Sequence, residues 1–285
     1  MSIQIHCATT NTCNGRCGFC PYISPEAMAL PKGFMSMDLF RKIADEAATI
    51  PQLSSWAFSA LGEPLLDKHL DERVKYVKTI RPEWEVEMYT NGVFLTPERY
   101  ESLKAAGLDY LSVSLNAVSQ EQHERIMGIK GKFQTVVDNL NYAIKSGGVD
   151  IQVKAVLNHD TFTRDHQMDF YLTWGIKHHP HIKEGYGRCV IERNWAGSNR
   201  TIEGANVLDF NPNECCSRAV EQLSILWDGI VTPCCFRPLK TEIFGDLKKQ
   251  TIKEIYNSDV YLKFREAHIE NRAADYDFCA GCTRV

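Results

Sequence analysis

Residues 3–22, IQIHCATTNTCNGRCGFCPY, join a strand-like run to three closely spaced cysteines. The run at 3–9 is short and mostly apolar, which indicates a strand. Cys13, Cys17 and Cys20 follow it at the spacing C-x3-C-x2-C. In folds built on parallel strands, reactive loops follow the carboxyl ends of the strands. The stretch therefore predicts a reactive loop at the end of the first strand.

The pattern of a short apolar run followed by an amphipathic segment recurs along residues 1–200. Apolar residues recur at helical spacing in the segments between the runs. Six such units imply parallel strands joined by right-handed crossovers. Because six are too few to close an eight-fold barrel, the sequence predicts an α/β fold with an open, partial (β/α)6 barrel over residues 1–200. The expected strands are 3–9, 55–61, 84–90, 110–116, 151–158 and 188–194, and the expected helices are 37–50, 66–80, 96–107 and 133–148.

Residues 201–285 show a different pattern and predict a small α+β domain. Two strand-like runs flank the turn Asp228-Gly229 within LSILWDGIVTPCC, residues 223–235, and this is a hairpin signal. A helical segment follows at 251–269, with an interruption at Asn257-Ser258. The chain then reaches a final CAGC.

Composition narrows the function classes. The chain has 285 residues, 44% of them apolar, and a net charge of −4, so no nucleic-acid partner is expected. The N-terminus lacks the pattern of a secretory signal, and no apolar run approaches the roughly 20 residues that span a bilayer. We expect a cytoplasmic protein with no membrane association. Its 11 cysteines then indicate metal binding, because cytosolic disulfides are rare and the count is odd.

The three-cysteine loop predicts an iron–sulfur cluster with one open iron. A structural zinc site is closed by four ligands, and no histidine lies near enough in the sequence to complete this one. A [4Fe–4S] cubane has four irons, each of which takes one external ligand. Three cysteines therefore leave one iron free to chelate a small molecule. A cluster that activates a cofactor needs this open position, and an electron carrier does not.

The spacing C-x3-C-x2-C after the first strand of a βα barrel resembles the radical S-adenosylmethionine (radical SAM) enzymes. That resemblance implies a [4Fe–4S] cluster on Cys13, Cys17 and Cys20 whose open iron binds SAM. It also implies that one electron from the cluster cleaves SAM to methionine and a 5′-deoxyadenosyl radical, which takes a hydrogen atom from the substrate.

Other segments at strand ends agree with this resemblance. LGEP (61–64) is similar to the family's Gly-Gly-Glu-Pro motif, with leucine in place of the first glycine. Glu63 would accept hydrogen bonds from the methionine ammonium. Ser114 and Asn116 are expected to share one face of a strand, where they would contact the ribose. By the same resemblance, the residues that contact SAM are Phe19, Gly62, Glu63, Pro64, Asn91, Ser114, Asn116, Arg125 and Asn158.

The cysteines of residues 201–285 resemble those of a twitch domain, the shortened form of the SPASM module, which holds one auxiliary [4Fe–4S] cluster. Two adjacent pairs, Cys215-Cys216 and Cys234-Cys235, precede the final CAGC. Neighbours on a strand point to opposite faces, so one member of each pair is expected to bind. The choice within each pair stays open, and a zinc ribbon with four cysteine ligands is the alternative. By the resemblance, the ligands are Cys216, Cys234, Cys279 and Cys282.

A cluster held by four protein ligands cannot bind substrate without losing one, so we expect it to transfer electrons. Twitch-bearing radical SAM dehydrogenases use such a cluster when they oxidise a secondary alcohol of an aminocyclitol. Resemblance to them implies dehydrogenation of a small polyol or aminocyclitol-type molecule, with Arg188, Glu192 and Arg193 as candidates for the base. An electron donor such as flavodoxin or ferredoxin is also implied.

The alternative is a peptide-modifying enzyme that epimerises or crosslinks its substrate. Many relatives of that kind carry an N-terminal peptide-recognition domain, and a first strand beginning at residue 3 leaves no room for one. An epimerase needs a hydrogen donor, and a thiol that is not a ligand would supply it. Candidates for that thiol are Cys235, Cys215 and Cys189.

Overall fold

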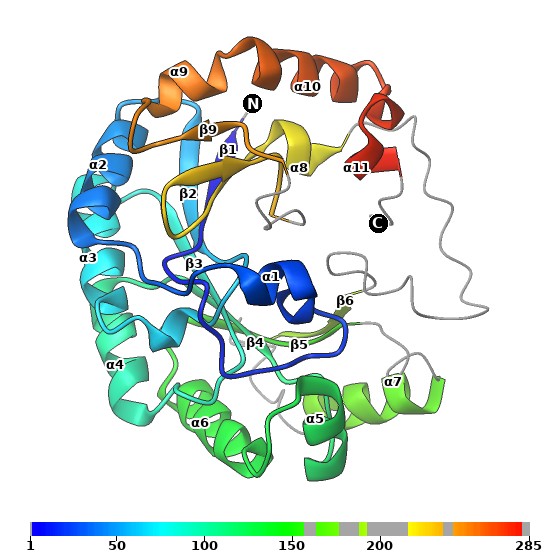
Figure 1. Ribbon diagram of the computed structural model, residues 1–285. Helices are drawn as coiled ribbons and strands as arrows, with labels where there is room; N and C mark the ends of the chain where they lie inside the picture. Colours follow the sequence, from blue (N-terminus) through cyan, green and yellow to red (C-terminus); the bar gives the residue numbers. More distant parts are fainter. Residues whose placement is uncertain (1, 157–163, 177–187, 193–215, 236–241, 281–285) are drawn as a thin grey trace.

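The computed structural model describes residues 2–156, 164–176, 188–192, 216–235 and 242–280. Within these ranges the chain forms a curved sheet, and helices follow its outer side (Figure 1). The predicted class, a mixed α/β fold built on a partial barrel, is confirmed.

Six parallel strands stand in the order β6-β5-β4-β3-β2-β1, as a partial barrel requires. Strands that follow one another in the chain are neighbours in the sheet, because each crossover returns on the outside. All six predicted strands are confirmed to within a few residues at their ends. They are β1 (Ile3–Cys7), β2 (Leu53–Phe58), β3 (Glu85–Thr90), β4 (Tyr110–Ser114), β5 (Asp150–Val156) and β6 (Arg188–Glu192).

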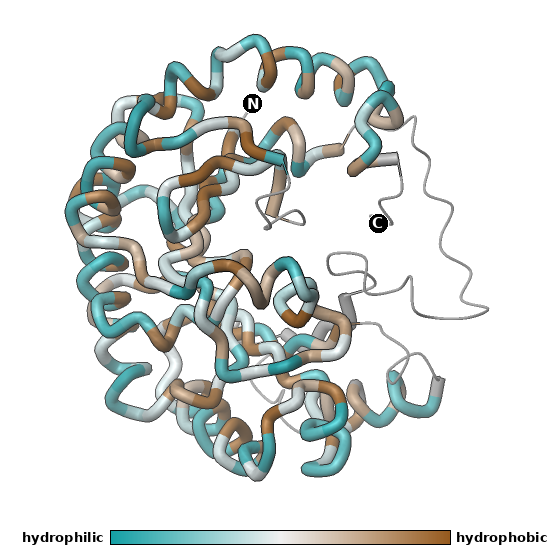
Figure 2. Tube along the Cα trace, viewed as in Figure 1, coloured by the Kyte–Doolittle hydropathy of each residue, from teal (hydrophilic) through white to brown (hydrophobic). Residues whose placement is uncertain are grey.

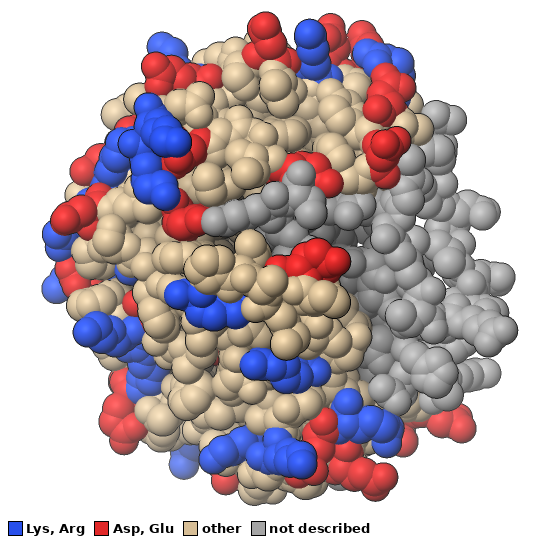
Figure 3. All heavy atoms as spheres, viewed as in Figure 1, with Lys and Arg blue, Asp and Glu red and all other residues tan. Residues whose placement is uncertain are grey.

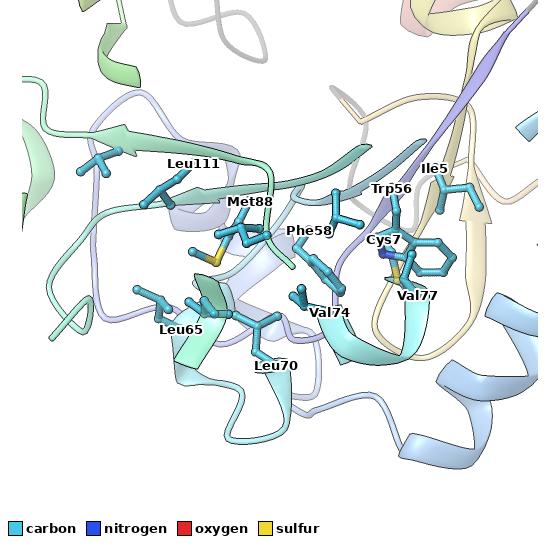
Figure 4. Close-up of a cluster of buried hydrophobic side chains, with 14 of the residues drawn as sticks. Ile5, Cys7, Trp56, Phe58, Leu65, Leu70, Val74, Val77, Met88 and Leu111 are labelled. Atoms are coloured by element: carbon cyan, nitrogen blue, oxygen red, sulfur yellow. The ribbon is translucent and has the colours of Figure 1, made fainter. Parts of the chain in front are cut away.

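Alternation along the strands separates an apolar face from a polar one. Ile5 of β1 is level with Trp56 of β2, Trp56 is level with Val86 of β3, and all three are buried. This face packs against α3 (Leu70–Ile80), and Figure 4 shows Trp56 beside Val77 of that helix. The intervening residues point to the inside of the barrel. The inner face is therefore the polar one.

The helices around the sheet begin and end where the sequence signals them. The expected helix over 96–107 begins after Thr96, whose hydroxyl accepts from the Arg99 amide at 3.3 Å, and ends at Gly107 with φ of +98°. Figure 2 shows apolar and polar residues alternating along these helices, as expected for helices with one buried face. They are α2 (Met37–Ala48), α3, α4 (Pro97–Ala106), α5 (Gln120–Met127), α6 (Phe133–Ser146) and α7 (Arg164–Phe170). Shorter turns are η1 (Pro21–Ile23), α1 (Pro25–Ala29), η2 (Pro64–Leu66), η3 (Tyr171–Ile176) and η6 (Ala273–Asp275).

The carboxyl-terminal segment extends the barrel sheet. The predicted hairpin is present, with β7 (Gln222–Ile225) antiparallel to β8 (Ile230–Thr232) and Gly229 at φ of +83° in the turn. β7 also pairs in parallel with β1, which places Leu223 level with Ile5. The sequence predicts the hairpin but not this pairing, which covers an edge that β1 would otherwise expose. The remaining elements are β9 (Gly245–Asp246), α8 (Ser217–Val220), α9 (Ile252–Tyr256), α10 (Asp259–Ile269) and α11 (Asp277–Ala280).

Hydrogen bonds from α2 fasten this segment to the barrel. Lys42 Nζ donates to the Leu247 carbonyl at 2.8 Å, and the Glu46 carboxylate accepts from the Ile252 amide at 2.9 Å. The predicted interruption of the last long helix is confirmed, since α9 ends at Tyr256 with Asn257 as its C-cap and Ser258 caps the start of α10. These bonds hold the part of the carboxyl-terminal segment around residues 247–252 against α2 of the barrel.

Charges of both signs mix over the surface. On the face in Figure 3, Lys and Arg side chains alternate with Asp and Glu side chains. None of the described helices combines the length and the apolar run that crossing a lipid bilayer requires.

Candidate active site

A cavity opens at the carboxyl ends of the strands and reaches the three-cysteine loop. Cys7 at the end of β1 and Val156 at the end of β5 both line it. This is the edge at which chemistry gathers in barrels of parallel strands. The same cavity is lined by eleven residues that the sequence predicted: Cys13, Cys17, Phe19, Cys20, Gly62, Glu63, Pro64, Asn91, Ser114, Asn116 and Cys235.

The three-cysteine loop is anchored on the end of α5, a helix that the sequence analysis did not predict. The Arg16 amide donates to the Met127 carbonyl at 2.9 Å, and the Gly18 amide donates to the Ile126 carbonyl at 3.2 Å. These carbonyls belong to the last turn of α5, which lacks partners within the helix. The signal for α5 was present, because Ser119 caps its start and Gly128, at φ of +62°, ends it.

The three thiols share one site. Burial, and after it the Glu63 carboxylate, raises the pKa of Cys13 to about 12. Burial, followed by the neighbouring Cys20 and Cys13 thiols, raises the pKa of Cys17 well above its usual range. No disulfide joins the cysteines in the described residues. Thiols in such a setting stay protonated until a metal displaces the protons.

This arrangement fits a [4Fe–4S] cluster. Among the described residues, no three His, Cys, Asp or Glu side chains stand close enough to hold a single metal ion. A cubane needs thiolates spread around several irons rather than around one point. Three cysteines that line one cavity from one anchored loop supply such a set, with the rest of the cavity open beside it.

Glu63 is held ready to accept a cation. Its side chain is 2% exposed, and one carboxylate oxygen accepts from the Leu65 amide at 3.1 Å and from Thr90 Oγ1 at 2.6 Å. The other oxygen accepts from the Asn91 amide at 2.8 Å. Burial raises the pKa of Glu63 to about 7, although the three hydrogen bonds act in the opposite direction. A bound ammonium would favour the ionised form.

Gly62 brings the Gly-Glu-Pro turn against the cysteine loop. Its φ is +102°, and a Cβ there would lie 2.3 Å from the Thr10 carbonyl oxygen. The Glu63 amide also donates to the Thr12 carbonyl at 2.8 Å. The close approach therefore needs a residue without a side chain.

We expect Gly62→Ala to lower the free energy of unfolding by about 3 kcal/mol or more, since left-handed strain and a backbone clash add. Gly131→Ala is the matched control, because Gly131 has φ of +64° with nothing within 4 Å of the added Cβ. It should cost about 1 kcal/mol, the left-handed penalty alone. Urea unfolding of both metal-free variants measures the difference, and equal losses would contradict the role of the close approach.

Asn91 and Asn116 hold the loops that surround the cavity. Asn91 Nδ2 donates to Asn14 Oδ1 at 2.8 Å, which ties the end of β3 to the cysteine loop. Asn116 Oδ1 accepts from the Val156 amide at 2.6 Å, which joins the ends of β4 and β5. β4 ends at Ser114 and Asn116 has φ of +59°, so a left-handed turn, and not strand alternation, brings both residues to the cavity.

The structure does not bring every predicted residue to the cavity. Arg125 lies in the last turn of α5, with its side chain 48% exposed and Nη1 3.9 Å from the Glu121 carboxylate, and it does not line the cavity. Arg188 and Glu192 are the first and last residues of β6. Other predicted residues lie outside the described residues: Asn158, Arg193, Cys215 and Cys282.

Side chains inside the barrel form a chain of hydrogen bonds that no sequence motif marks. His6 Nδ1 is 2.6 Å from Ser59 Oγ, and His6 Nε2 is 2.7 Å from Gln4 Oε1. Gln4 Nε2 donates to one Glu87 oxygen at 2.6 Å, and the Tyr89 hydroxyl donates to the other at 2.9 Å. Apart from Glu87, these residues line the cavity. The signal in the sequence was the alternation of polar and apolar residues along β1 and β3, which places these polar side chains on one face.

The directions of these bonds fix the tautomer of His6. Gln4 gives its amide proton to Glu87, so its oxygen faces His6 and accepts from Nε2–H. Nδ1 then carries the lone pair and accepts from the Ser59 hydroxyl. Burial, followed by the charge of Arg218, lowers the pKa of His6 to about 4, so the ring is neutral near pH 7. The Ser59 oxygen can therefore accept a proton from a ligand while its own proton points to His6.

The described carboxyl-terminal cysteines differ in their surroundings. Cys235 is 4% exposed, lines the cavity and donates through Sγ to Gln222 Oε1 at 3.3 Å. Its neighbour Cys234 does not line the cavity. Cys216 and Cys279 both pack against a small buried cluster of Ala219, Val220 and Phe264. This division agrees with Cys216, Cys234 and Cys279 as ligands, which stays a prediction.

The fold, the three-cysteine loop and the second cysteine set define an iron–sulfur enzyme class, and the family model agrees. The chain belongs to the radical SAM superfamily, whose model matches residues 8–163, more than half of the chain. Residues 215–283 match the SPASM model, described as an iron-sulfur cluster-binding domain. The predicted cofactors, SAM with its [4Fe–4S] cluster and an auxiliary cluster, follow from these two matches.

Two curated relatives illustrate the range of the family. S-adenosyl-L-methionine-dependent 2-deoxy-scyllo-inosamine dehydrogenase of Niallia circulans is 23% identical over 282 residues, which are 99% of this chain and 93% of that enzyme. GTP 3′,8-cyclase of Mycobacterium sp. (strain KMS) is 31% identical over 161 residues, which are 56% of this chain and 45% of the cyclase. The chain thus matches about half the length of the cyclase.

Solved structures share the fold. BtrN in complex with AdoMet and 2-DOIA has a TM-score of 0.67 at 23% identity, covering 100% of this chain and 94% of that one. Native anSMEcpe with bound AdoMet has a TM-score of 0.69 at 16% identity, covering 93% and 83%. SuiB of Streptococcus suis bound to precursor peptide SuiA has a TM-score of 0.64 at 13% identity, covering 93% and 67%.

Proposed function

We propose that the protein is a radical SAM dehydrogenase that oxidises a secondary alcohol of a small polyol or aminocyclitol-type molecule to a ketone. The observation that carries the proposal is the polar wall of the cavity. Gln4, Ser59 and Tyr89 line the same cavity as Glu63 and the three-cysteine loop. A molecule with several hydroxyl groups needs such partners, because each buried hydroxyl must be hydrogen-bonded. The match to the N. circulans dehydrogenase over nearly the whole chain supports the same reading.

Cys13, Cys17 and Cys20 would hold the cluster that binds SAM, and Glu63 would accept hydrogen bonds from the SAM ammonium. When bound, the first cluster and SAM would supply abstraction of the hydrogen atom from the carbinol carbon, and the auxiliary cluster would supply an acceptor for one electron. Phe19, Gly62, Pro64 and Asn91 would shape the SAM site, with Ser114 and Asn116 toward the ribose. Arg125 lies outside the cavity, 3.9 Å from the Glu121 carboxylate, and has no role in this scheme.

The hydroxyl proton leaves through this chain's own residues. Removing a hydrogen atom, an electron and a proton from an alcohol leaves a closed-shell ketone, so a base must take the proton. Ser59 Oγ lines the cavity and accepts it, while the Ser59 proton passes to His6 Nδ1 at 2.6 Å. The Gln4 oxygen accepts from Nε2–H of the resulting imidazolium, and the Gln4 amide donates in turn to Glu87. Arg188, Glu192 and Arg193 remain further candidates for this role, on or directly after β6.

The electron would leave near Cys235, which lines the cavity beside Gln222 of β7. Cys216, Cys234, Cys279 and Cys282 would hold the auxiliary cluster, and Cys234 adjoins Cys235, which lines the cavity. One residue therefore separates the substrate space from the auxiliary site. The protein would act in the cytoplasm, where flavodoxin or ferredoxin would supply the electron that starts the reaction.

One observation favours a second candidate, a peptide epimerase. The Cys235 thiol is buried at the cavity wall, where it would give a hydrogen atom to a substrate radical. The structures of anSMEcpe and SuiB, which include complexes with peptides, share the fold.

A product scan of the reconstituted enzyme separates the two candidates. The panel contains 2-deoxy-scyllo-inosamine, related polyols and short peptides, incubated with SAM and dithionite in heavy water. We expect a product that is two hydrogens lighter than its substrate, with 5′-deoxyadenosine in equal amount. A product of unchanged composition apart from one deuterium, lost in Cys235→Ala, would instead establish epimerisation.

A further inference from the structure

The inner face of α10 contributes Phe264 to the small buried cluster against which Cys216 and Cys279, two predicted ligands of the auxiliary cluster, pack. Tyr261, Phe264, Arg265 and His268 follow one another at helical spacing, and all four are buried. The Phe264 ring packs edge-on against the rings of Tyr276 and Phe244, with centroids 5.0 Å apart in each pair. The surroundings are therefore aromatic and poorly solvated, a setting in which a hydrogen bond is stronger than in water.

His268 is aimed at one predicted ligand. Its Nε2 lies 3.6 Å from Cys279 Sγ, and its side chain is 2% exposed. Its Nδ1 has no hydrogen-bond partner within the described part of the chain. The ring packs edge-on against Phe264 at a centroid distance of 4.6 Å, which fixes its orientation. The contact with Cys279 is thus the one polar interaction found for the buried His268 ring among the described residues, and it points to a role at that sulfur.

The chemistry of the sulfur decides the direction of that contact. A thiolate bound to iron only accepts hydrogen bonds, so the imidazole must place its proton on Nε2 and donate. A hydrogen bond to a ligand sulfur withdraws electron density from the cluster. The reduced form, which carries one more negative charge, is thereby favoured, and the reduction potential rises.

We propose that His268 sets the reduction potential of the auxiliary cluster by donating Nε2–H to the sulfur of Cys279. His268 is a positioning residue in this scheme, since it acts on the cluster through Cys279. The proposal rests on Cys279 as a ligand and not on the identity of the substrate. It gives the auxiliary cluster the higher potential that an acceptor of substrate electrons needs.

The test is a potentiometric titration followed by electron paramagnetic resonance. It uses the full chain with Cys13, Cys17 and Cys20 changed to alanine, so that only the auxiliary cluster gives a signal. In that background, His268→Phe keeps an aromatic ring without a donor, and His268→Gln restores an N–H. We expect both to retain the iron of one cluster. We also expect H268F to lower the midpoint potential by about 59 mV or more, a tenfold loss in the equilibrium constant for one electron, and H268Q to recover part of it.

His166→Phe on α7 is the matched control, because His166 is a buried histidine away from α10, and it should leave the midpoint unchanged. An unchanged midpoint in H268F, or equal shifts in H268F and H268Q, would overturn the proposal. So would loss of the cluster in both H268F and His268→Ala with retention in H268Q, which would make His268 a structural residue. Retention of full iron in Cys279→Ala would show that Cys279 is not a ligand, which would overturn the proposal for His268. The proposed dehydrogenase function would not be affected by that result.

Discussion

Changing Cys13, Cys17 and Cys20 together to alanine should lower the iron content of the anaerobically reconstituted protein from about eight to about four per chain, one cubane each. Formation of 5′-deoxyadenosine from SAM and dithionite should fall to background. The reason is that the three thiols line one cavity and share one anchored loop, while the auxiliary ligands lie in a separate segment. Iron and sulfide quantitation, with chromatography of the nucleoside, measures both results.

Cys7→Ala is the control for removal of a thiol. Cys7 borders the cavity at the end of β1, but it is fully buried in the core cluster and belongs to neither set of predicted ligands. Burial raises its pKa to about 12, as expected for a core thiol. This variant should keep all its iron, with some loss of stability. If the triple variant retained eight irons, or if the wild-type protein held zinc alone, the assignment of the loop would be wrong.

The fold was predictable because local signals and packing agree. β1 to β6 and the long helices α2, α3, α4 and α6 were expected from alternation, helical spacing and end signals such as Thr96 and Gly107. The cysteine loop and the Gly-Glu-Pro turn were expected because each is a contiguous motif. Such motifs carry their geometry in a few residues, and Gly62 does so through its φ of +102° and its contact with Thr10.

Contacts between distant segments could not be predicted in the same way. The parallel pairing of β7 with β1 depends on which sheet edge is exposed, and no pattern within residues 223–235 states it. The chain from Ser59 through His6 and Gln4 to Glu87 joins three segments whose residues are ordinary polar positions of strands. Arg125 was expected near SAM from its place at a helix end alone, and in the structure it lies beside Glu121 and does not line the cavity.

Changes in the hydrogen-bonded chain from Ser59 to Glu87 should separate SAM cleavage from ketone formation. With the substrate found in the product scan, Ser59→Ala or His6→Gln should lower the ketone formed per 5′-deoxyadenosine by about 100-fold, within the range of a lost general base. SAM cleavage and transfer of deuterium from a labelled carbinol carbon should continue, because neither residue belongs to the cysteine loop or the Glu63 turn. His166→Gln, at a buried histidine on α7, should keep the wild-type ratio.

The physical reason is the state of His6 before reaction. Its pKa of about 4 keeps the ring neutral near pH 7, with the lone pair on Nδ1 facing Ser59. The ring can therefore take a proton as the electron departs, when the hydroxyl of the substrate radical becomes strongly acidic. Glutamine in place of His6 preserves a polar contact to its neighbours but offers no basic nitrogen. Ketone yields that track 5′-deoxyadenosine equally in wild type, S59A and H6Q would mean that the proton leaves by another route, with Glu192 of β6 as the next residue to test.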